Sequence, residues 1–286
     1  MKNIIKLEFV KTLGYPGFRT IVILHIILFF LVVLVASNFK IPLQAILGTK
    51  ANFPISALGI NKLFAFPYVW ATISWIASWF NILLGILVIM LVGNEYQFRT
   101  FRKQILDGVS RNQMLNAKMI IMATLAFYAL ILVLFTGLVF GIIYSDSFTL
   151  TSIFEKIPFV LVLFIQSFAY MMLGMLFALI FKSNSISIIT YILFFFPGEP
   201  ILRAFFPDSI DRFFPIKIIS NLTPIPDFVE ILSKDIIQIN GKAPASLQSM
   251  GLLPDTFSIW ISTLVCLGYI AVFYYASKMI IERKNF

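Results

Sequence analysis

The chain has 286 residues, of which 60% are hydrophobic and only 12% are charged, against roughly 25% charged in soluble domains. Its mean hydropathy is +0.95. A soluble domain does not need so much apolar surface, whereas a membrane protein does, because its apolar side chains face lipid. The composition excludes an ordinary soluble enzyme and predicts an all-α, polytopic membrane protein with a single domain over residues 1–286.

Cysteine and histidine are almost absent, with one of each in the chain. Cys266 alone excludes a disulfide framework and a cysteine-based metal site. His25 lies in an apolar run, where it is either a packed, hydrogen-bonded imidazole or a polar group in a substrate path. We therefore expect neither a metal nor a cofactor bound by this chain.

Six stretches are long and apolar enough to cross a bilayer, which takes about 20 helical residues. The first is expected to remain as a membrane helix, because its apolar core is longer than that of a cleaved signal peptide. The six spans are predicted over residues 20–39, 66–93, 119–144, 157–181, 186–202 and 256–277.

The fifth span is predicted to end abruptly. Its last residues include Pro197, Gly198 and Pro200, which should break the helix. We expect the chain there either to leave the membrane or to fold back as a re-entrant piece. A long, proline-rich outer segment follows over residues 199–255, and helical spacing of apolar residues predicts an amphipathic helix over 227–239.

Positive charge is concentrated in the N-terminal tail, the loop 94–118, the turn at Lys182 and the tail from Lys278. These segments hold 13 basic and four acidic residues, and so account for the whole net charge of +9. Basic residues mark the cytoplasmic side of membrane proteins. We therefore expect both termini and the loop 94–118 to be cytoplasmic, and this charge needs no nucleic-acid partner to explain it.

The loop 94–118 is the most informative segment. Phe98, Phe101 and Ile105 are predicted to form one apolar stripe of a short helix that ends at Asp107-Gly108. The sequence from Ser110 to Gln113 predicts a capping box that opens the third span. Such a helix is either a membrane-surface connector or a lever between two membrane helices that a soluble motor grips.

This segment resembles the cytoplasmic loop after the second span in ABC-2 type permeases, the transmembrane subunits of ABC transporters. The similarity is carried by residues that match the family pattern: Glu95, Thr100, Leu106, Ser110, Arg111 and Lys118. Two positions depart from it, because Arg99 replaces the usual Gly before the Thr and no Pro precedes Ser110. The order of six spans, the N-terminal helix with Glu8, and the long outer segment agree with this family.

The resemblance implies an exporter of the ABC-2 (type V) fold with six spans and a coupling helix. It implies a dimer with a second permease copy or a paralogue, two ABC ATPase subunits that bind ATP and Mg²⁺, and a bacterial cytoplasmic (inner) membrane. Changes at Phe101 or Arg102 are expected to uncouple the ATPase. The ATPase-coupling residues implied are Glu95, Phe98, Arg99, Thr100, Phe101, Arg102, Ile105, Ser110 and Arg111. The first and fifth spans would face the dimer axis, and candidates for a substrate path or gate are His25, Asn81, Phe195, Phe196 and Glu199.

Motifs for independent chemistry are missing from the sequence. It has no phosphate-binding loop of the form G-x-x-x-x-G-K-[ST] and none of the usual hydrolase motifs. The chain is therefore not expected to be an enzyme by itself. Two alternatives stay open: a stand-alone carrier or membrane enzyme with a polar site at His25, Asn81 or Glu199, and a membrane assembly factor that transports nothing. The sequence does not choose a substrate.

Overall fold

The computed structural model describes residues 2–38, 60–147, 149–226 and 257–283. All regular elements within these ranges are helices, and six helical segments are long and apolar enough to cross a membrane. The protein is thus a multi-pass α-helical membrane protein. The six spans are α2 (Pro16–Asn38), α4 (Val69–Gln97), α6 (Arg111–Tyr144), α7–α8 (Leu150–Phe154 and Pro158–Phe181), α9–α10 (Asn184–Leu193 and Glu199–Arg203) and α14 (Ile259–Arg283).

Each span lies where hydropathy predicts it, although most helices are longer than predicted. The largest difference is at α6, which begins at Arg111 and not at 119 and runs unbroken to Tyr144. The cause is the Ser110 cap, because the helix begins where its first N–H groups find an acceptor and not where the lipid begins. Two turns of α6 therefore precede the apolar part of the span.

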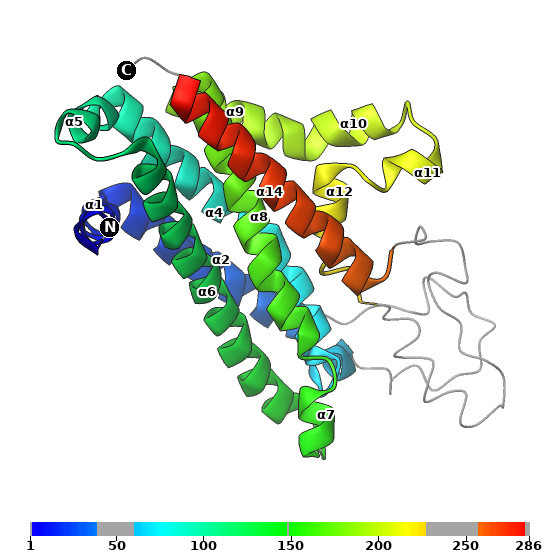
Figure 1. Ribbon diagram of the computed structural model, residues 1–286. Coiled ribbons are helices and arrows are strands. Elements are labelled where there is room, and N and C mark those ends of the chain that lie inside the picture. The colour runs from blue at the N-terminus through cyan, green and yellow to red at the C-terminus, as the bar shows by residue number, and fades with distance from the viewer. Residues whose placement is uncertain (1, 39–59, 148, 227–256, 284–286) are drawn as a thin grey trace.

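Helix α8 is the centre of the bundle, and it packs against α4, α6 and α14 (Figure 1). Its crossing with α4 is close because Gly85 and Gly174 face each other there. A Cβ on Gly174 would lie 2.7 Å from the carbonyl oxygen of Gly85, and a Cβ on Gly85 would lie 2.2 Å from the hydroxyl of Tyr191 on α9. Small residues let membrane helices approach closely and gain van der Waals contact.

The fifth span differs from its prediction, because Pro197 and Gly198 do not break the helix. A π-helical turn, η3 (Phe194–Gly198), joins α9 to α10, so that one continuous helix runs from Asn184 to Arg203. A π turn accommodates the missing N–H of a proline by widening one turn of the helix. In Figure 1 this helix diverges from the other spans beyond the end of α8.

After α10 the chain folds back onto the bundle. Helix α11 (Asp208–Asp211) forms the turn, and α12 (Pro215–Ser220) packs against α8 and α14. Of the two outcomes expected after the fifth span, the structure therefore shows a return onto the bundle. The helix predicted over 227–239 lies outside the described residues, as does most of the segment 199–255.

Two smaller elements lie at the end of the bundle that carries α7. The 3₁₀ helix η2 (Ile60–Phe64) precedes α4, and the indole of Trp70 on α4 donates a 2.6 Å hydrogen bond to the carbonyl of Ile153 on α7. The opposite end of the bundle carries α1 (Lys2–Gly14), α5 (Thr100–Leu106) and the C-terminal end of α14 (Figure 1).

The Gly85–Gly174 crossing predicts the effect of one added methyl group. Gly174→Ala should lower the stability of the detergent-solubilised protein by about 1–3 kcal/mol, because the methyl meets rigid backbone. Gly268→Ala on α14 is the matched control, since no atom lies within 4 Å of its new Cβ. Thermal unfolding measures both, and equal melting temperatures for the two variants would contradict the close crossing.

Candidate functional site

Four charged side chains from three helices meet at the end of the bundle that carries α5. Lys11 Nζ of α1 lies 2.7 Å from Glu8 Oε1 and 2.5 Å from Glu95 Oε1, in the last turn of α4. Lys118 Nζ of α6 lies 3.3 Å from Glu8 Oε2 and 2.5 Å from Glu95 Oε2. Each ammonium group therefore contacts both carboxylates. We call Glu8, Lys11, Glu95 and Lys118 the charge cluster.

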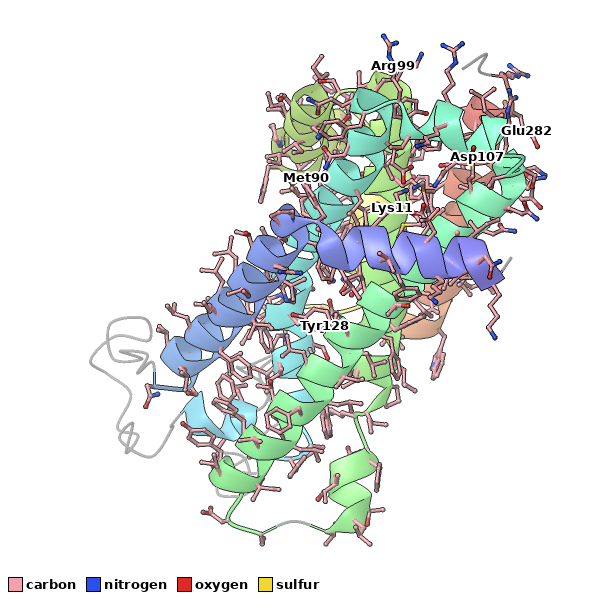
Figure 2. All side chains as sticks on the ribbon, turned by 90° about the vertical axis from the view of Figure 1, so that its left-hand side faces the viewer. Lys11, Met90, Arg99, Asp107, Tyr128 and Glu282 are labelled. Carbon is pink, nitrogen blue, oxygen red and sulfur yellow. The ribbon has the colours of Figure 1, made fainter. Side chains whose placement is uncertain are left out.

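The charge cluster forms because α1 does not continue in line with α2. Figure 2 shows α1, which carries the labelled Lys11, running across the bundle, and this helix packs on α6. Glu8 and Lys11 are one helical turn apart, so both reach the same neighbouring helices. The cluster thus ties the N-terminal helix to the end of the second span and the start of the third.

Burial makes the cluster interdependent. Glu8, Glu95 and Lys118 are at most 6% exposed, whereas Lys11 is partly open to solvent. A single buried charge without a partner costs several kcal/mol, and that cost is offset here because two positive groups meet two negative ones. Removal of any one member leaves an uncompensated charge, so the four residues fix one relative placement of α1, α4 and α6.

Helix α5 packs directly on the charge cluster. Gln104 Nε2 donates a 3.2 Å hydrogen bond to Glu8 Oε1, and the Thr100 hydroxyl donates to the carbonyl oxygen of Glu95 at 3.3 Å. The buried ring of Phe101 lies 5.2 Å from Lys118 Nζ, in cation–π geometry. Phe101 also packs against Tyr96, with 4.8 Å between ring centroids. The inner face of α5 is therefore bonded to both spans that flank it.

The Glu8 carboxyl has a strongly perturbed pKa. Burial raises the pKa of Glu8, but the charges of Lys118 and Lys11, together with hydrogen bonds from Lys11 and Gln104, lower it to about 2. A carboxyl with this pKa is ionised at every physiological pH. Glu8 thus acts as a fixed anion that holds two ammonium groups.

The backbone between α4 and α5 is sharply bent at Arg99. This residue has φ 54° and ψ 24°, the left-handed conformation that glycine adopts most easily. It occupies the position where the resembled family carries Gly. The bend also corrects one prediction, because Phe98 does not share an apolar stripe with Phe101 and Ile105. Phe98 precedes the bend and is 69% exposed, whereas Phe101 is buried.

The exit from α5 agrees with the sequence prediction. Helix α5 ends at Leu106, and Gly108 has a φ of 85°. Ser110 and Gln113 form the expected capping box at the start of α6. Arg111 donates a hydrogen bond to the carbonyl oxygen of Glu282, near the end of α14. The segments around the N-terminus, α5 and α14 are therefore joined at one end of the bundle.

A cavity of about 160 Å³ opens beside the charge cluster. Its walls come from α1 and from the α4–α5 corner, and they include charged, polar and aromatic groups. The lining residues are Glu8, Lys11, Thr12, Tyr15, Leu91, Asn94, Glu95, Phe98 and Thr100. One side of the buried cluster is thus accessible from outside the bundle.

The candidates for a substrate path lie in separate contacts. His25 Nδ1 is 3.1 Å from the Tyr128 hydroxyl on α6, Phe195 packs against Tyr170, and Phe196 is half exposed. Asn81 and Glu199 are both buried polar side chains. Each belongs to a hydrogen-bond network at one end of α12.

Helix α12 is held at both ends by buried side chains of the spans. At its start, the Glu199 carboxylate accepts 2.7 Å hydrogen bonds from the N–H groups of Ile216 and Lys217. At its end, Gln166 Nε2 donates to the carbonyl oxygen of Ile219 at 2.9 Å. Asn81 Nδ2 in turn donates to Gln166 Oε1 at 3.5 Å, and Asn81 Oδ1 accepts a 2.8 Å hydrogen bond from Ser167. These contacts give Asn81 and Glu199 a role in seating α12.

No protein-family model and no curated protein matches the chain. Of the charge cluster, the sequence predicts only Glu95 as a site residue, and Glu8 and Lys118 enter only through the family resemblance. Lys11 and Gln104 are not predicted at all. The opposite charges of Glu8 and Lys11, one turn apart, were the available signal for the first. Gln104 gave none, because a single amide in a basic, polar loop has no distinctive spacing.

The charge cluster predicts a specific response to acid. Glu8→Gln should destabilise the protein by about 3 kcal/mol at neutral pH, because it leaves an excess positive charge in a buried site. With its pKa lowered from 4.5 to about 2, Glu8 stabilises fully above pH 4.5. Its contribution is lost as the pH falls through 2. The stability difference between wild type and variant should therefore shrink steadily on acidification.

Chemical unfolding of the two proteins in detergent at several pH values measures this difference. Glu282→Gln is the control, because Glu282 is exposed and pairs loosely with Lys278, at 3.8 Å. Such surface pairs contribute at most about 1 kcal/mol to stability. A difference that does not depend on pH would contradict the assigned role of Glu8.

The bend at Arg99 predicts a stabilising substitution. Arg99→Gly should raise the stability by about 1 kcal/mol, because glycine adopts the left-handed conformation without the steric cost of a Cβ. Arg102→Gly, inside α5, should instead lower it by about 1 kcal/mol through poorer helix propensity. Melting temperatures of the two variants separate these effects, and a loss for Arg99→Gly would show that the corner is not strained.

Proposed function

We propose that this protein is the membrane-spanning permease subunit of an ABC transporter of the ABC-2 type, driven by a separate ATPase. The observation that carries the proposal is a short helix, α5, fixed by buried polar contacts between two spans and exposed on its other face. A helix held in this way transmits an applied force to α4 and α6 together, which is what a coupling helix requires.

The outer face of α5 is suited to a soluble partner. Phe98, just before α5, and Leu106, its last residue, are 69% and 77% exposed, and Arg102 and Lys103 are also exposed. In Figure 2 the labelled Arg99 and Asp107 lie nearer than Lys11 to the top of the view, the end of the molecule that carries α5. Aromatic and arginine side chains are enriched in protein interfaces, and an exposed leucine beside them adds apolar area that a partner can bury.

The proposed mechanism passes through the charge cluster. ATP and Mg²⁺ bind to two ATPase subunits, and closure of these subunits moves α5. Because Gln104 and Thr100 bond to Glu8 and Glu95, the movement reaches α1 and both flanking spans as one unit. A second permease copy or a paralogue completes the transporter, and the spans then open a path, in the direction of export.

The arrangement of the ends supports the proposed topology. The bonds among Glu8, Glu95, Lys118, Arg111 and Glu282 bring both terminal helices and α5 to one end of the bundle. This end also carries the positive charge expected on the cytoplasmic side. These observations support the proposal that both termini and α5 are cytoplasmic and that the protein lies in the bacterial cytoplasmic membrane.

Removal of the exposed apolar side chains of Phe98 and Leu106, at the two ends of α5, should release the ATPase. In the Phe98→Ala, Leu106→Ala double variant, the amount of co-purifying ATPase and the rate of ATP hydrolysis should both fall more than tenfold. The reason is that two anchor side chains contribute about 1–2 kcal/mol each to binding. Phe101 is unsuitable as the probe, since it is buried under Lys118 and its loss would disturb folding.

The chain offers a matched control at the other end of the bundle. Phe154 and Leu150 on α7 are 59% and 76% exposed, so the Phe154→Ala, Leu150→Ala variant removes the same atoms far from α5. It should retain the ATPase fully. If the wild-type protein, expressed with its neighbouring genes and purified in mild detergent, carries no ATPase, the proposal is wrong.

A further inference from the structure

Helix α1 has a second face that the charge cluster does not use. Glu8 and Thr12 point into the protein, whereas Leu7, Val10 and Leu13 are 45%, 62% and 54% exposed. Lys2 and Lys6 are exposed on the same face, toward the N-terminal end of the helix. The outward face of α1 is therefore apolar and basic, and it carries no acidic side chain.

Helix α1 lies directly before a membrane span. Helix α2 is a membrane span and begins at Pro16, two residues after α1 ends at Gly14. Figure 2 shows that α1 then runs across the bundle and does not extend away from it. The outward residues of α2, such as Ile23 and Ile27, are apolar and exposed. The outward face of α1 thus continues the exposed apolar surface of α2.

The charges at this level of the molecule are not balanced by the protein. Lys11 and Lys118 are neutralised inside the charge cluster, so they contribute nothing to the outward face. Lys2 and Lys6 form no ion pair among the described residues. Arg19 donates a hydrogen bond from Nε to the carbonyl oxygen of Leu13 at 3.2 Å, which keeps its exposed guanidinium at the corner between α1 and α2. Three cations therefore lie near the exposed apolar side chains of α1.

We propose that the outward face of α1 binds anionic phospholipids of the bilayer in which the protein sits. Leu7, Val10 and Leu13 lie among the upper parts of the acyl chains, and Lys2, Lys6 and Arg19 contact the headgroup phosphates. Basic and apolar side chains on one surface helix favour this arrangement, because lysine stems reach the headgroups while aliphatic groups stay in hydrocarbon. An anionic lipid, rather than a neutral one, supplies the missing charge.

The lipid contact has a consequence for the charge cluster. Glu8 lies on the opposite side of the same helix, so a lipid that holds the outward face also holds Glu8 against Lys118. Anionic lipid should then stabilise the seating of α1 on α4 and α6. The inference depends only on the membrane location and on α1, and it stands or falls separately from the proposed ATPase partner.

Spin labels test whether the face of α1 lies in lipid. In the full chain with Cys266→Ser, a nitroxide at Val10→Cys is compared with one at Lys103→Cys on α5, in nanodiscs that contain phosphatidylcholine and phosphatidylglycerol. The Val10 label should be relaxed by oxygen more than by a water-soluble nickel chelate, and the Lys103 label should show the reverse. A Val10 label as open to nickel as that at Lys103 overturns the proposal. A label shielded from both reagents overturns it too, because a protein then covers the face.

Lipid titration tests the headgroup contact. Native mass spectrometry of the detergent-solubilised full chain should show tighter binding of phosphatidylglycerol than of phosphatidylcholine. Each lysine near an anionic surface contributes about fivefold in affinity. The Lys2→Gln, Lys6→Gln variant should therefore bind phosphatidylglycerol more than tenfold more weakly, with its affinity for phosphatidylcholine unchanged. The Arg102→Gln, Lys103→Gln variant removes the same charge from α5 and should bind as wild type does. Equal losses in the two variants, or no preference between the two lipids, would overturn the proposal.

Discussion

The architecture of this protein depends on a neutral cluster of four charges, three of which are buried. Two carboxylates and two ammonium groups come from α1, α4 and α6, and each cation contacts both anions. Each of the three most buried members would destabilise the fold if it were charged and without a partner in that environment. The helices therefore share one placement that satisfies all four charges, and α5 completes it through Gln104 and Phe101.

The charge cluster is linked to the centre of the bundle through α4. The Gly85–Gly174 crossing holds α4 tightly on α8, so a movement of α4 is passed to the centre of the bundle. At the other side, α12 is bonded to Glu199 and Gln166, which lie on α10 and α8. A force applied at α5 thus has a continuous, well-packed route through the spans toward the segment that follows α10.

The sequence predicts the features that depend on neighbouring residues or on average hydropathy. The six spans, the Ser110 capping box and the stop at Gly108 are of this kind, and the structure confirms them. The errors come from backbone conformations that local pattern does not encode: the left-handed Arg99 turns Phe98 outward, and a π turn carries the helix past Pro197. The cluster itself needed tertiary information, because Lys11 meets Glu95 only once α1 has folded across the bundle.

The charge cluster holds α5 on the membrane helices in one rigid arrangement. Double electron–electron resonance between labels at Lys103→Cys on α5 and Ile143→Cys at the far end of α6, in a Cys266→Ser background, measures this most directly. A rigid attachment should give one narrow distance distribution, which broadens markedly when Glu8→Gln is added. An equally narrow distribution in that variant would show that α5 is held by something other than the cluster.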